Sequence, residues 1–184
     1  MRSQISWQGV MFAVLLFGGG LFLGSYRYSG EPTHSSASER LQPAPAGPST
    51  STDGTIVYVP VYSSLYLGVS ARAQTVDLAA TVSVRNTSSV HPITLEWVRY
   101  YDSTGKQVRD YLDKPSALPP LASVEFVIQR SDAAGGPGAN FLIRWNGPAN
   151  IDQPLIEAVM FGQSGNAGVS FTSRGQVVRS TPRE

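Results

Sequence analysis

Hydrophobic and polar residues alternate along most of the chain after Gly54. In the segment LAATVSVRN, a period of two places Leu78, Ala80, Val82 and Val84 on one side of an extended backbone. This pattern predicts a strand with one face in a core. Other segments follow the same rule, and the further residues expected to face inward are Ile93, Leu95, Trp97, Val124, Phe126, Ile128, Phe141, Ile143 and Trp145.

Turn signals separate these segments at short intervals. The sequence DSTGK, with Gly105 suited to a positive φ, predicts a tight hairpin between ITLEWVRYYD and KQVRDYL. No window beyond residue 54 shows sustained helical periodicity. The pattern therefore predicts an all-β domain over residues 55–180, an antiparallel β-sandwich of immunoglobulin or fibronectin type with about seven or eight strands.

The stretch VYVPVYSSLY carries Tyr58, Tyr62 and Tyr66 at intervals of four. A helix would also align these rings, but the valines between them are poor helix formers and Pro60 would break a helix. In a strand, the even spacing again places the three tyrosines on one side. Because Pro60 cannot donate to a ladder, we expect a first strand near residues 55–62 at the edge of a sheet.

Residues 1–28 differ in kind from the rest of the chain. No charged residue lies between Arg2 and Arg27, and aromatic residues flank the apolar run. As a helix, residues 5–26 would extend about 33 Å, comparable with a hydrocarbon layer of roughly 30 Å. We therefore predict a transmembrane signal-anchor. A cleaved signal peptide is the alternative, although the apolar run continues past the small residues that would form its cleavage site.

Gly20 and Gly24 form a G-x-x-x-G pair within this segment. Such a pair can let two membrane helices approach closely, so a homodimer through these glycines is one hypothesis. The simpler interpretation is that glycine is frequent in membrane helices.

Residues 29–54 are built of Ser, Thr, Pro, Ala and Gly, with Leu41 as the only large aliphatic residue. Such a segment cannot bury enough apolar surface to offset the entropy of ordering it. It is predicted to be a disordered linker that holds the domain away from the membrane.

Composition excludes several classes of function. The chain has no cysteine, which rules out disulfides, thiolate nucleophiles and cysteine-ligated metals. Lys and Arg total 14 against 13 for Asp and Glu, a formal net charge of +1. With so little excess charge, no nucleic-acid partner is expected.

Few residues of the predicted domain suggest catalysis. His91 is its only histidine, and no G-x-S-x-G motif presents a serine. The run SDAAGGPGAN precedes a strand instead of a helix, so we interpret it as a long, flexible hairpin loop and not as a phosphate-binding loop. Asp102, Asp110 and Asp113 could serve as paired carboxylates or bind calcium, but their place around a turn favours a solvated rim. We predict no catalytic residue, no metal and no cofactor.

A further motif, Asn86-Thr87-Ser88, matches a glycosylation acceptor. A turn is the simpler interpretation of the same residues, because Asn and Ser side chains readily bond to nearby backbone.

Aromatic and arginine side chains give the clearer signal, which is for binding. Flat amphipathic rings can stack on a glycan or a peptide, and guanidinium groups can bind carboxylates or phosphates. The alternative is that half or more of the strand rings, which are Tyr58, Tyr62, Tyr100, Tyr101 and Tyr111, seal the ends of the core with only their hydroxyls in water. The predicted ligand surface consists of Tyr58, Tyr62, Tyr66, Arg99, Tyr101, Arg144 and Arg174.

Several segments, in order, resemble a bacterial family known as a domain of unknown function: VYVPVYSSLYLG, LAATVSVRNTS, ITLEWVRYYDSTGKQVRDYL, LPPLASVEFVI, GGPGANFLIRW, IEAVMFG and VSFTSRGQVV. The resemblance covers roughly residues 55–179. It implies a short protein with an N-terminal membrane or signal segment, and it implies no catalytic residue because the family has no assigned activity. In pattern alone, TVSVRNTSSVHPITLEWVRYYDSTGKQV is similar to late-embryogenesis-abundant-like and other immunoglobulin-like modules.

These observations predict a single-pass protein of the bacterial inner membrane whose domain faces the periplasm or the cell exterior. We expect it to be a non-enzymatic binding or assembly module with a protein or glycan partner in the envelope. The alternatives are a hydrolase of envelope polysaccharide that uses the hairpin carboxylates, a structural spacer, and a soluble protein exported after signal cleavage.

Overall fold

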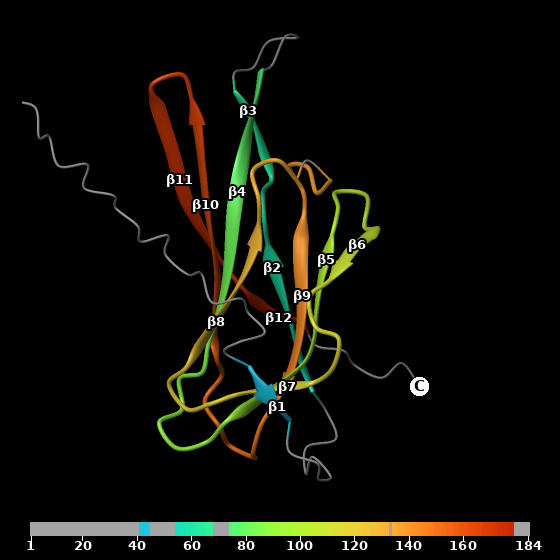
Figure 1. Ribbon diagram of the computed structural model, residues 1–184, viewed down its shortest axis with the longest axis vertical. Coiled ribbons are helices and arrows are strands. Elements are labelled where there is room, and N and C mark those ends of the chain that lie inside the picture. Colours follow the sequence, from blue (N-terminus) through green and yellow to red (C-terminus); the bar gives the residue numbers. More distant parts are fainter. Residues whose placement is uncertain (1–40, 45–53, 68–73, 133, 179–184) are drawn as a thin grey trace, which may run out of the picture. The chain divides into compact units, whose positions relative to one another are not determined.

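The computed structural model of the chain describes residues 41–44, 54–67, 74–132 and 134–178 (Figure 1). Within these residues the structure is all β, which confirms the predicted class. The strands are β1 (Gln42–Pro43), β2 (Thr55–Pro60), β3 (Ser64–Leu67), β4 (Gln74–Arg85), β5 (Ile93–Tyr101), β6 (Gln107–Asp110), β7 (Ser116–Leu118), β8 (Ser123–Ile128), β9 (Asn140–Asn146), β10 (Leu155–Ser164), β11 (Ala167–Arg174) and β12 (Gln176–Val178).

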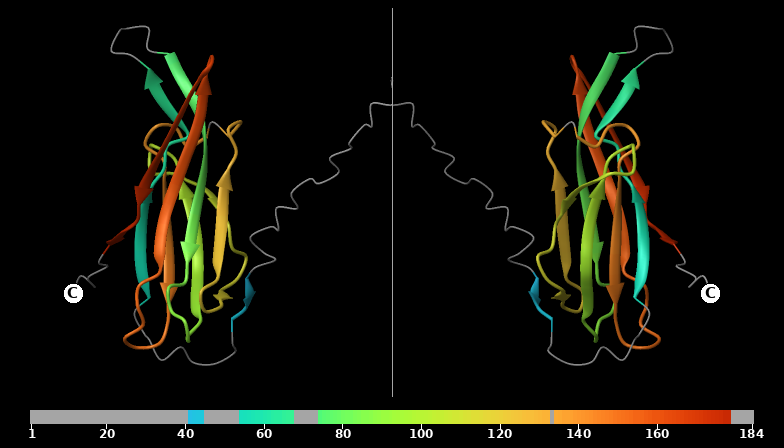
Figure 2. Two further views of the ribbon diagram at one scale, coloured as in Figure 1. Left: turned by 90° about the vertical axis from the view of Figure 1, so that its left-hand side faces the viewer. Right: turned by 90° about the vertical axis from the view of Figure 1, so that its right-hand side faces the viewer.

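The strands form two antiparallel sheets. The seven-stranded sheet has the order β1-β7-β5-β9-β2-β12, with β6 also paired to β5. The five-stranded sheet has the order β11-β10-β4-β3, with β8 also paired to β4. The two sheets form the layers of a β-sandwich (Figure 2), because residues from both of them make up one hydrophobic core.

Alternating burial follows the predicted pattern in most strands. Leu78, Ala80, Val82 and Val84 of β4 are fully buried. The inward-facing residues predicted for β8 and β9 are buried as well, namely Val124, Phe126, Ile128, Phe141, Ile143 and Trp145. These side chains supply most of the stabilisation, at roughly 1.5–3 kcal/mol for each large apolar group removed from water.

The prediction for Trp97 is wrong, because β5 contains a β-bulge. Its pairing with β9 shifts between Leu95, opposite Trp145, and Trp97, opposite Arg144. One extra residue reverses the alternation, so Val98 and Tyr100 are buried beyond the bulge whereas Trp97 is half-buried on the outer face.

The predicted edge position of the first strand is also wrong. β2 lies inside the seven-stranded sheet, paired to β9 on one side and to β12 on the other. Pro60 is compatible with this place because it is the last residue of β2, where the ladder to β12 has already ended at Tyr58. The strand that covers this edge comes from the far end of the sequence, which local pattern does not reveal.

The chain passes from one sheet to the other at Gly175. β11 pairs with β10 in the five-stranded sheet, and β12 pairs with β2 in the seven-stranded sheet. A Cβ at Gly175 would lie 2.6 Å from Val57 Cγ1 and 3.1 Å from the Ile156 carbonyl oxygen, so the crossing leaves no room for a side chain. Ser173 Oγ donates to the Pro60 carbonyl beside it, which joins the two sheets along this flank.

Part of the predicted linker has regular structure. Gln42 and Pro43 form β1, which pairs with Ala117 and Ser116 of β7, and Leu41 packs against the core. The prediction of disorder is therefore too broad at residues 41–44, where the one large aliphatic side chain of the segment packs against apolar residues.

The other linker residues before Gly54, and the predicted anchor over residues 1–28, lie outside the described residues. The described residues contain no helix with the length and apolar character to cross a membrane.

Asn86 joins the two sheets at the end of β4. Its side chain is buried, and Nδ2 donates to the carbonyls of His91 at 2.8 Å, Leu118 at 3.2 Å and Pro119 at 3.0 Å. Its Oδ1 accepts from the amide of Ser88 at 3.0 Å. The side chain is thus a structural part of the turn, as the simpler interpretation of the Asn86-Thr87-Ser88 motif predicted.

We expect Asn86→Asp to destabilise the domain by about 2–4 kcal/mol, because a carboxylate would face three carbonyl oxygens to which it cannot donate. Urea unfolding followed by circular dichroism measures the change. Ser89→Ala, at an exposed neighbouring position, is the control and should unfold within about 0.5 kcal/mol of the parent chain. Equal stability of the two variants would show that the amide does not hold the turn.

Candidate functional site

Four of the seven residues predicted to bind a ligand lie together on the outer face of the seven-stranded sheet. Tyr58 of β2 and Arg99 of β5 both lie opposite Leu142 of β9. Arg144 of β9 lies opposite Trp97, and Tyr101 follows Arg99 two residues along the same face. We call the surface formed by Tyr58, Trp97, Arg99, Tyr101, Leu142 and Arg144 the aromatic–arginine face; all six residues are half-buried.

Neighbouring carboxylates neutralise both guanidinium groups on this face. Arg99 Nε lies 3.2 Å from Asp110 Oδ2, and the Arg99 guanidinium lies 4.5 Å from the centre of the Trp97 ring, which it covers. Arg144 Nε lies 2.5 Å from Glu96 Oε2, an ion pair without the alignment of a hydrogen bond. The face is therefore polar and aromatic but carries no net charge.

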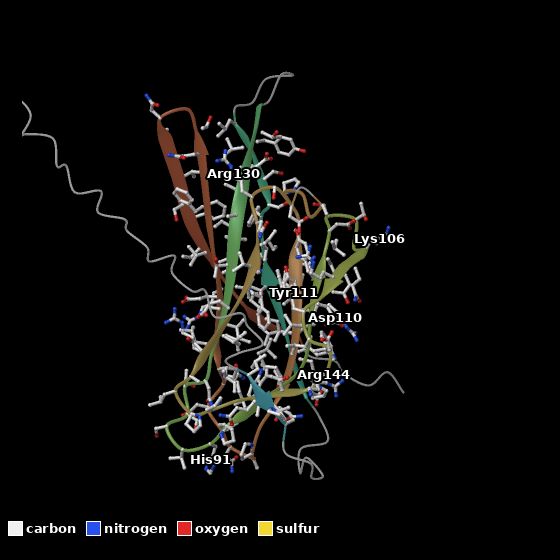
Figure 3. All side chains as sticks on the ribbon, viewed as in Figure 1. His91, Lys106, Asp110, Tyr111, Arg130 and Arg144 are labelled. Carbon is white, nitrogen blue, oxygen red and sulfur yellow. The ribbon has the colours of Figure 1, made fainter. Side chains whose placement is uncertain are left out.

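Glu96 is held in place by a second contact. Asn146 Nδ2 donates to Glu96 Oε1 at 2.6 Å, so an amide and a guanidinium hold the carboxylate from two sides. Glu96 belongs to the bulge itself, since the pairing shift falls between Leu95 and Trp97. The residue that turns Trp97 outward thus also fixes Arg144 beside it. Figure 3 shows Asp110 and Arg144 from this sheet.

The other three predicted ligand residues lie elsewhere. Tyr66 is 63% exposed and pairs with Thr75 on the outer face of the opposite, five-stranded sheet. Arg174 lies on that same outer face, opposite Glu157. Tyr62 packs edge-on against Phe171, with ring centres 5.5 Å apart, at the flank between the sheets. The predicted surface is therefore divided between two opposite faces and a flank.

Tyr100 is a core residue, as the alternative interpretation of the tyrosines proposed. Its ring packs on Phe141 at 5.1 Å, and a Cβ at Gly135 would overlap its hydroxyl. Ser63 lies nearby but donates its hydroxyl hydrogen to the Gly136 carbonyl, and Tyr100 Oη has no well-aligned partner among the described residues. Burial, with a smaller effect of Asp132, raises the pKa of Tyr100 to about 12.

Tyr111 closes the flank beside β8. Its ring lies 5.6 Å from Phe126 and 5.3 Å from Phe141, and its hydroxyl donates to the Val127 carbonyl at 3.2 Å. Arg109 lies over the ring at 5.5 Å and pairs with Asp132 at 3.1 Å. Burial raises the pKa of Tyr111 above its ordinary value. The ring therefore also seals the sandwich.

The hairpin carboxylates are occupied by structural contacts. Asp102 Oδ1 accepts from the Thr104 amide at 2.8 Å, the Thr104 hydroxyl at 2.7 Å and the Lys106 amide at 3.0 Å. The Thr104 hydroxyl and the Lys106 amide are the main causes that lower the pKa of Asp102. Asp110 pairs with Arg99, and Asp113 is exposed. A general acid needs a raised pKa, which these contacts do not provide for Asp102.

His91 is exposed in the turn before β5, and Figure 3 shows it at the lower end of the domain, far from Asp110 and Tyr111. In the part of the chain that the structure describes, no group of three or more His, Cys, Asp or Glu side chains is placed to hold a metal ion.

The glycine-rich segment is not the hairpin that the sequence suggested. It leads from β8 in the five-stranded sheet to β9 in the seven-stranded sheet, and these strands do not pair. Serine hydroxyls hold it on both sides: Ser63 Oγ donates to the Gly136 carbonyl at 3.1 Å, and Ser103 Oγ donates to the Gly135 carbonyl at 2.8 Å. The segment is thus a packed crossing between the sheets.

Sequence reasoning missed Trp97 as a surface residue. The only local signal was the run Glu96-Trp97, where a charged and a large aromatic residue are adjacent at the point where alternation fails. A second apolar group was also missed: Val127, Val159 and Phe161 are 42–54% exposed on the outer face of the five-stranded sheet.

Because its pKa is about 12 when folded and 10.0 when unfolded, Tyr100 contributes stability that is present below pH 10 and lost as the pH rises to 12. Between neutral pH and pH 12, the free energy of unfolding of Tyr100→Phe should fall by about 1–2 kcal/mol less than that of the parent chain. Near neutral pH the two free energies of unfolding should agree within about 1 kcal/mol. Urea unfolding between pH 8 and 12 tests this. Tyr66→Phe, whose ring is exposed, should keep the alkaline loss of the parent; the same behaviour in both variants would contradict the assignment.

Comparison with known proteins adds one clear relationship. No curated protein matches the chain. Among solved structures, the crystal structure of Thermotoga maritima 1070 is similar at 9% identity and a TM-score of 0.41, over 68% of this chain and 96% of that one; a likeness this weak carries no argument. A family model matches residues 54–178, the whole of the sandwich apart from β1. The chain therefore belongs to the family described as Protein of unknown function (DUF3124).

Proposed function

We propose that this protein is a non-enzymatic binding module of the bacterial cell envelope, whose aromatic–arginine face contacts a protein partner. In this proposal residues 1–28 anchor the chain in the inner membrane, and the domain, an immunoglobulin-like sandwich, lies outside the cytoplasm. The observation that carries the proposal is the outward position of Trp97 beside Arg99, with Tyr58, Tyr101 and Arg144 on the same sheet face.

The composition of this face supports contact with a protein. Trp, Tyr and Arg are the residue types that contribute most of the energy at protein–protein interfaces, and they do so near the centre of the contact. The two arginines are already paired with Asp110 and Glu96, so a partner would not have to bury an unpaired charge. The Arg99 guanidinium lies over the Trp97 ring, and carboxylates hold both guanidinium groups before binding, which lowers the entropy lost on association.

A glycan is the less favoured ligand. Sugar recognition by stacking needs an uncovered aromatic ring, whereas the Arg99 guanidinium covers one side of the Trp97 ring. An arginine stacked on tryptophan is compatible with a protein interface, where both groups can be buried together.

The hydrolase alternative receives less support from the hairpin carboxylates. Asp102 accepts three hydrogen bonds within its own turn, and Asp110 faces Arg99 on the neighbouring strand. Both carboxylates are therefore engaged by structural partners within the hairpin, whereas a pair of catalytic carboxylates must face a substrate across a cleft.

The envelope location rests on the sequence of residues 1–28, which has the length, lack of charge and flanking aromatic residues of a membrane anchor. Export of a soluble form after signal cleavage is the second candidate, because small residues occur within the run.

A photo-crosslinking experiment tests the binding face. With Tyr101 replaced by benzoylphenylalanine in the full-length chain and irradiation in intact cells, we expect one discrete protein adduct. Adding Trp97→Ala should reduce its yield at least tenfold, because the loss of an interface tryptophan commonly costs about 2 kcal/mol or more. As a control, Val159→Ala on the opposite sheet should leave the yield unchanged. An adduct digested by glycosidase and resistant to protease, or one insensitive to Trp97→Ala, would overturn the proposal.

Cell fractionation tests the anchor separately. The full-length chain should sediment with membranes and resist extraction at alkaline pH, while a chain that begins at Ser29 should not, since it lacks the only long apolar run. Intact mass of the mature protein distinguishes anchor from signal peptide. A mass that lacks the first 20 to 30 residues would contradict the anchor and favour the exported form.

A further inference from the structure

We propose that the open edge of β11 pairs with β11 of a second copy of this chain, in antiparallel orientation, so that the two five-stranded sheets become one continuous sheet. This inference concerns a different surface from the aromatic–arginine face and does not rest on the proposed function. β11 pairs with β10 on one side and with no described strand on the other. Figure 1 shows β11 at the outside of its sheet.

The other outer strands of the described residues are protected or short. The Val127 carbonyl of β8 accepts a hydrogen bond from the Tyr111 hydroxyl, so part of that edge is already satisfied. β6 has four residues, two of them the charged Arg109 and Asp110. β1, β12 and β3 have two, three and four residues. Short strands and charges are the usual means by which proteins prevent pairing at an edge.

β11 has none of these protections. It has eight residues, AGVSFTSR, and all eight pair with β10 in one register without a bulge. There is no proline or lysine, and the only charge is Arg174 at its end. Alternate residues of such a strand direct their backbone N–H and C=O groups away from β10, toward the open edge. A long, regular and almost uncharged edge is the surface that strand addition requires.

An added strand would also cover apolar surface. Phe171 and Tyr62 form a half-buried ring pair at this flank, and Val169 is half-buried beside them. These side chains point to the core face of β11, since Phe171 lies opposite the buried Met160. A neighbouring strand with apolar residues at alternate positions would complete the burial of these rings.

A second β11 has the required sequence. Opposed residues in an antiparallel pair point to the same face, and a two-fold axis keeps both core faces on one side of the joined sheet. The two-fold axis must then lie midway between a residue and the same residue of the second copy. The two registers with the longest overlap place Ser170 or Phe171 at this central position. Phe171 would face Val169 of the partner in the first and Phe171 of the partner in the second.

Charge favours the antiparallel arrangement of two copies. With the strands antiparallel, the two Arg174 residues lie at opposite ends of the joint ladder, whereas a parallel pair would place them side by side. Two copies also satisfy each other's open edge at once, so the pairing closes and does not continue into a fibre.

Site-specific crosslinking tests this pairing, because the chain has no cysteine and an introduced thiol is the only one present. In the full-length protein, solubilised in detergent if it is membrane-bound, Ser170→Cys or Thr172→Cys should give a covalent dimer with a short bismaleimide. Gln129→Cys, exposed after β8, is the control and should give at least tenfold less. A dimer held only through Gly20 and Gly24 would not crosslink selectively at β11.

A second variant checks the interface without a crosslinker. Thr172→Lys places a charge at the exposed edge, where it would face Gly168 or Ser170 of the second copy in the two registers, so light scattering should report the monomer mass where the parent has twice that mass. Thr104→Lys, on the exposed β5–β6 turn, should leave the dimer intact. A monomeric parent, crosslinking equal at Gln129 and Ser170, or a dimer unaffected by Thr172→Lys would each overturn the proposal.

Discussion

Alternate side chains from both sheets share one core, and the other features of the domain must be compatible with that packing. Fully buried residues such as Leu78, Phe126 and Ile143 come from strands of both sheets, so no sheet can bury its apolar face alone. The chain has no cysteine, so no disulfide links the two sheets and this shared core holds them together instead. Each strand is therefore confined to one register, since a shift by one residue would expose its apolar side.

The bulge in β5 is the point where this constraint produces a candidate binding surface. An extra residue at Glu96 lets Leu95 and Val98 both reach the core, and as a result Trp97 is placed on the outer face beside Arg144. Glu96 then pairs with Arg144, which keeps the bulge and the surface together as one unit. β-bulges commonly redirect a side chain in this way near functional sites. The same packing that stabilises the domain thus exposes a tryptophan among arginines and tyrosines.

Polar contacts hold the sheets together where the core ends. Asn86 donates to carbonyls at the end of β7 and before β5, Tyr111 donates to the Val127 carbonyl of β8, and Ser173 donates to the Pro60 carbonyl near the crossing at Gly175. These contacts hold the two sheets together at one end and at one point on each flank. The outer edge of β11 pairs with no strand among the described residues. The two binding proposals therefore concern separate surfaces: a sheet face for another protein and this sheet edge for a second copy.

Some features of this protein follow from the local sequence pattern, and others follow only from the pairing of strands that are distant in the sequence. The sequence alone determined the strand class, the inward residues of β4, β8 and β9 and the turn at Asn86, because a period of two and turn chemistry act over a few neighbouring residues. Tertiary structure alone decided that β2 is an inner strand, that Trp97 faces outward and that Tyr66 and Arg174 lie on the face opposite Tyr58. These outcomes depend on which distant strand becomes a neighbour, and that choice is made by packing the whole core at once.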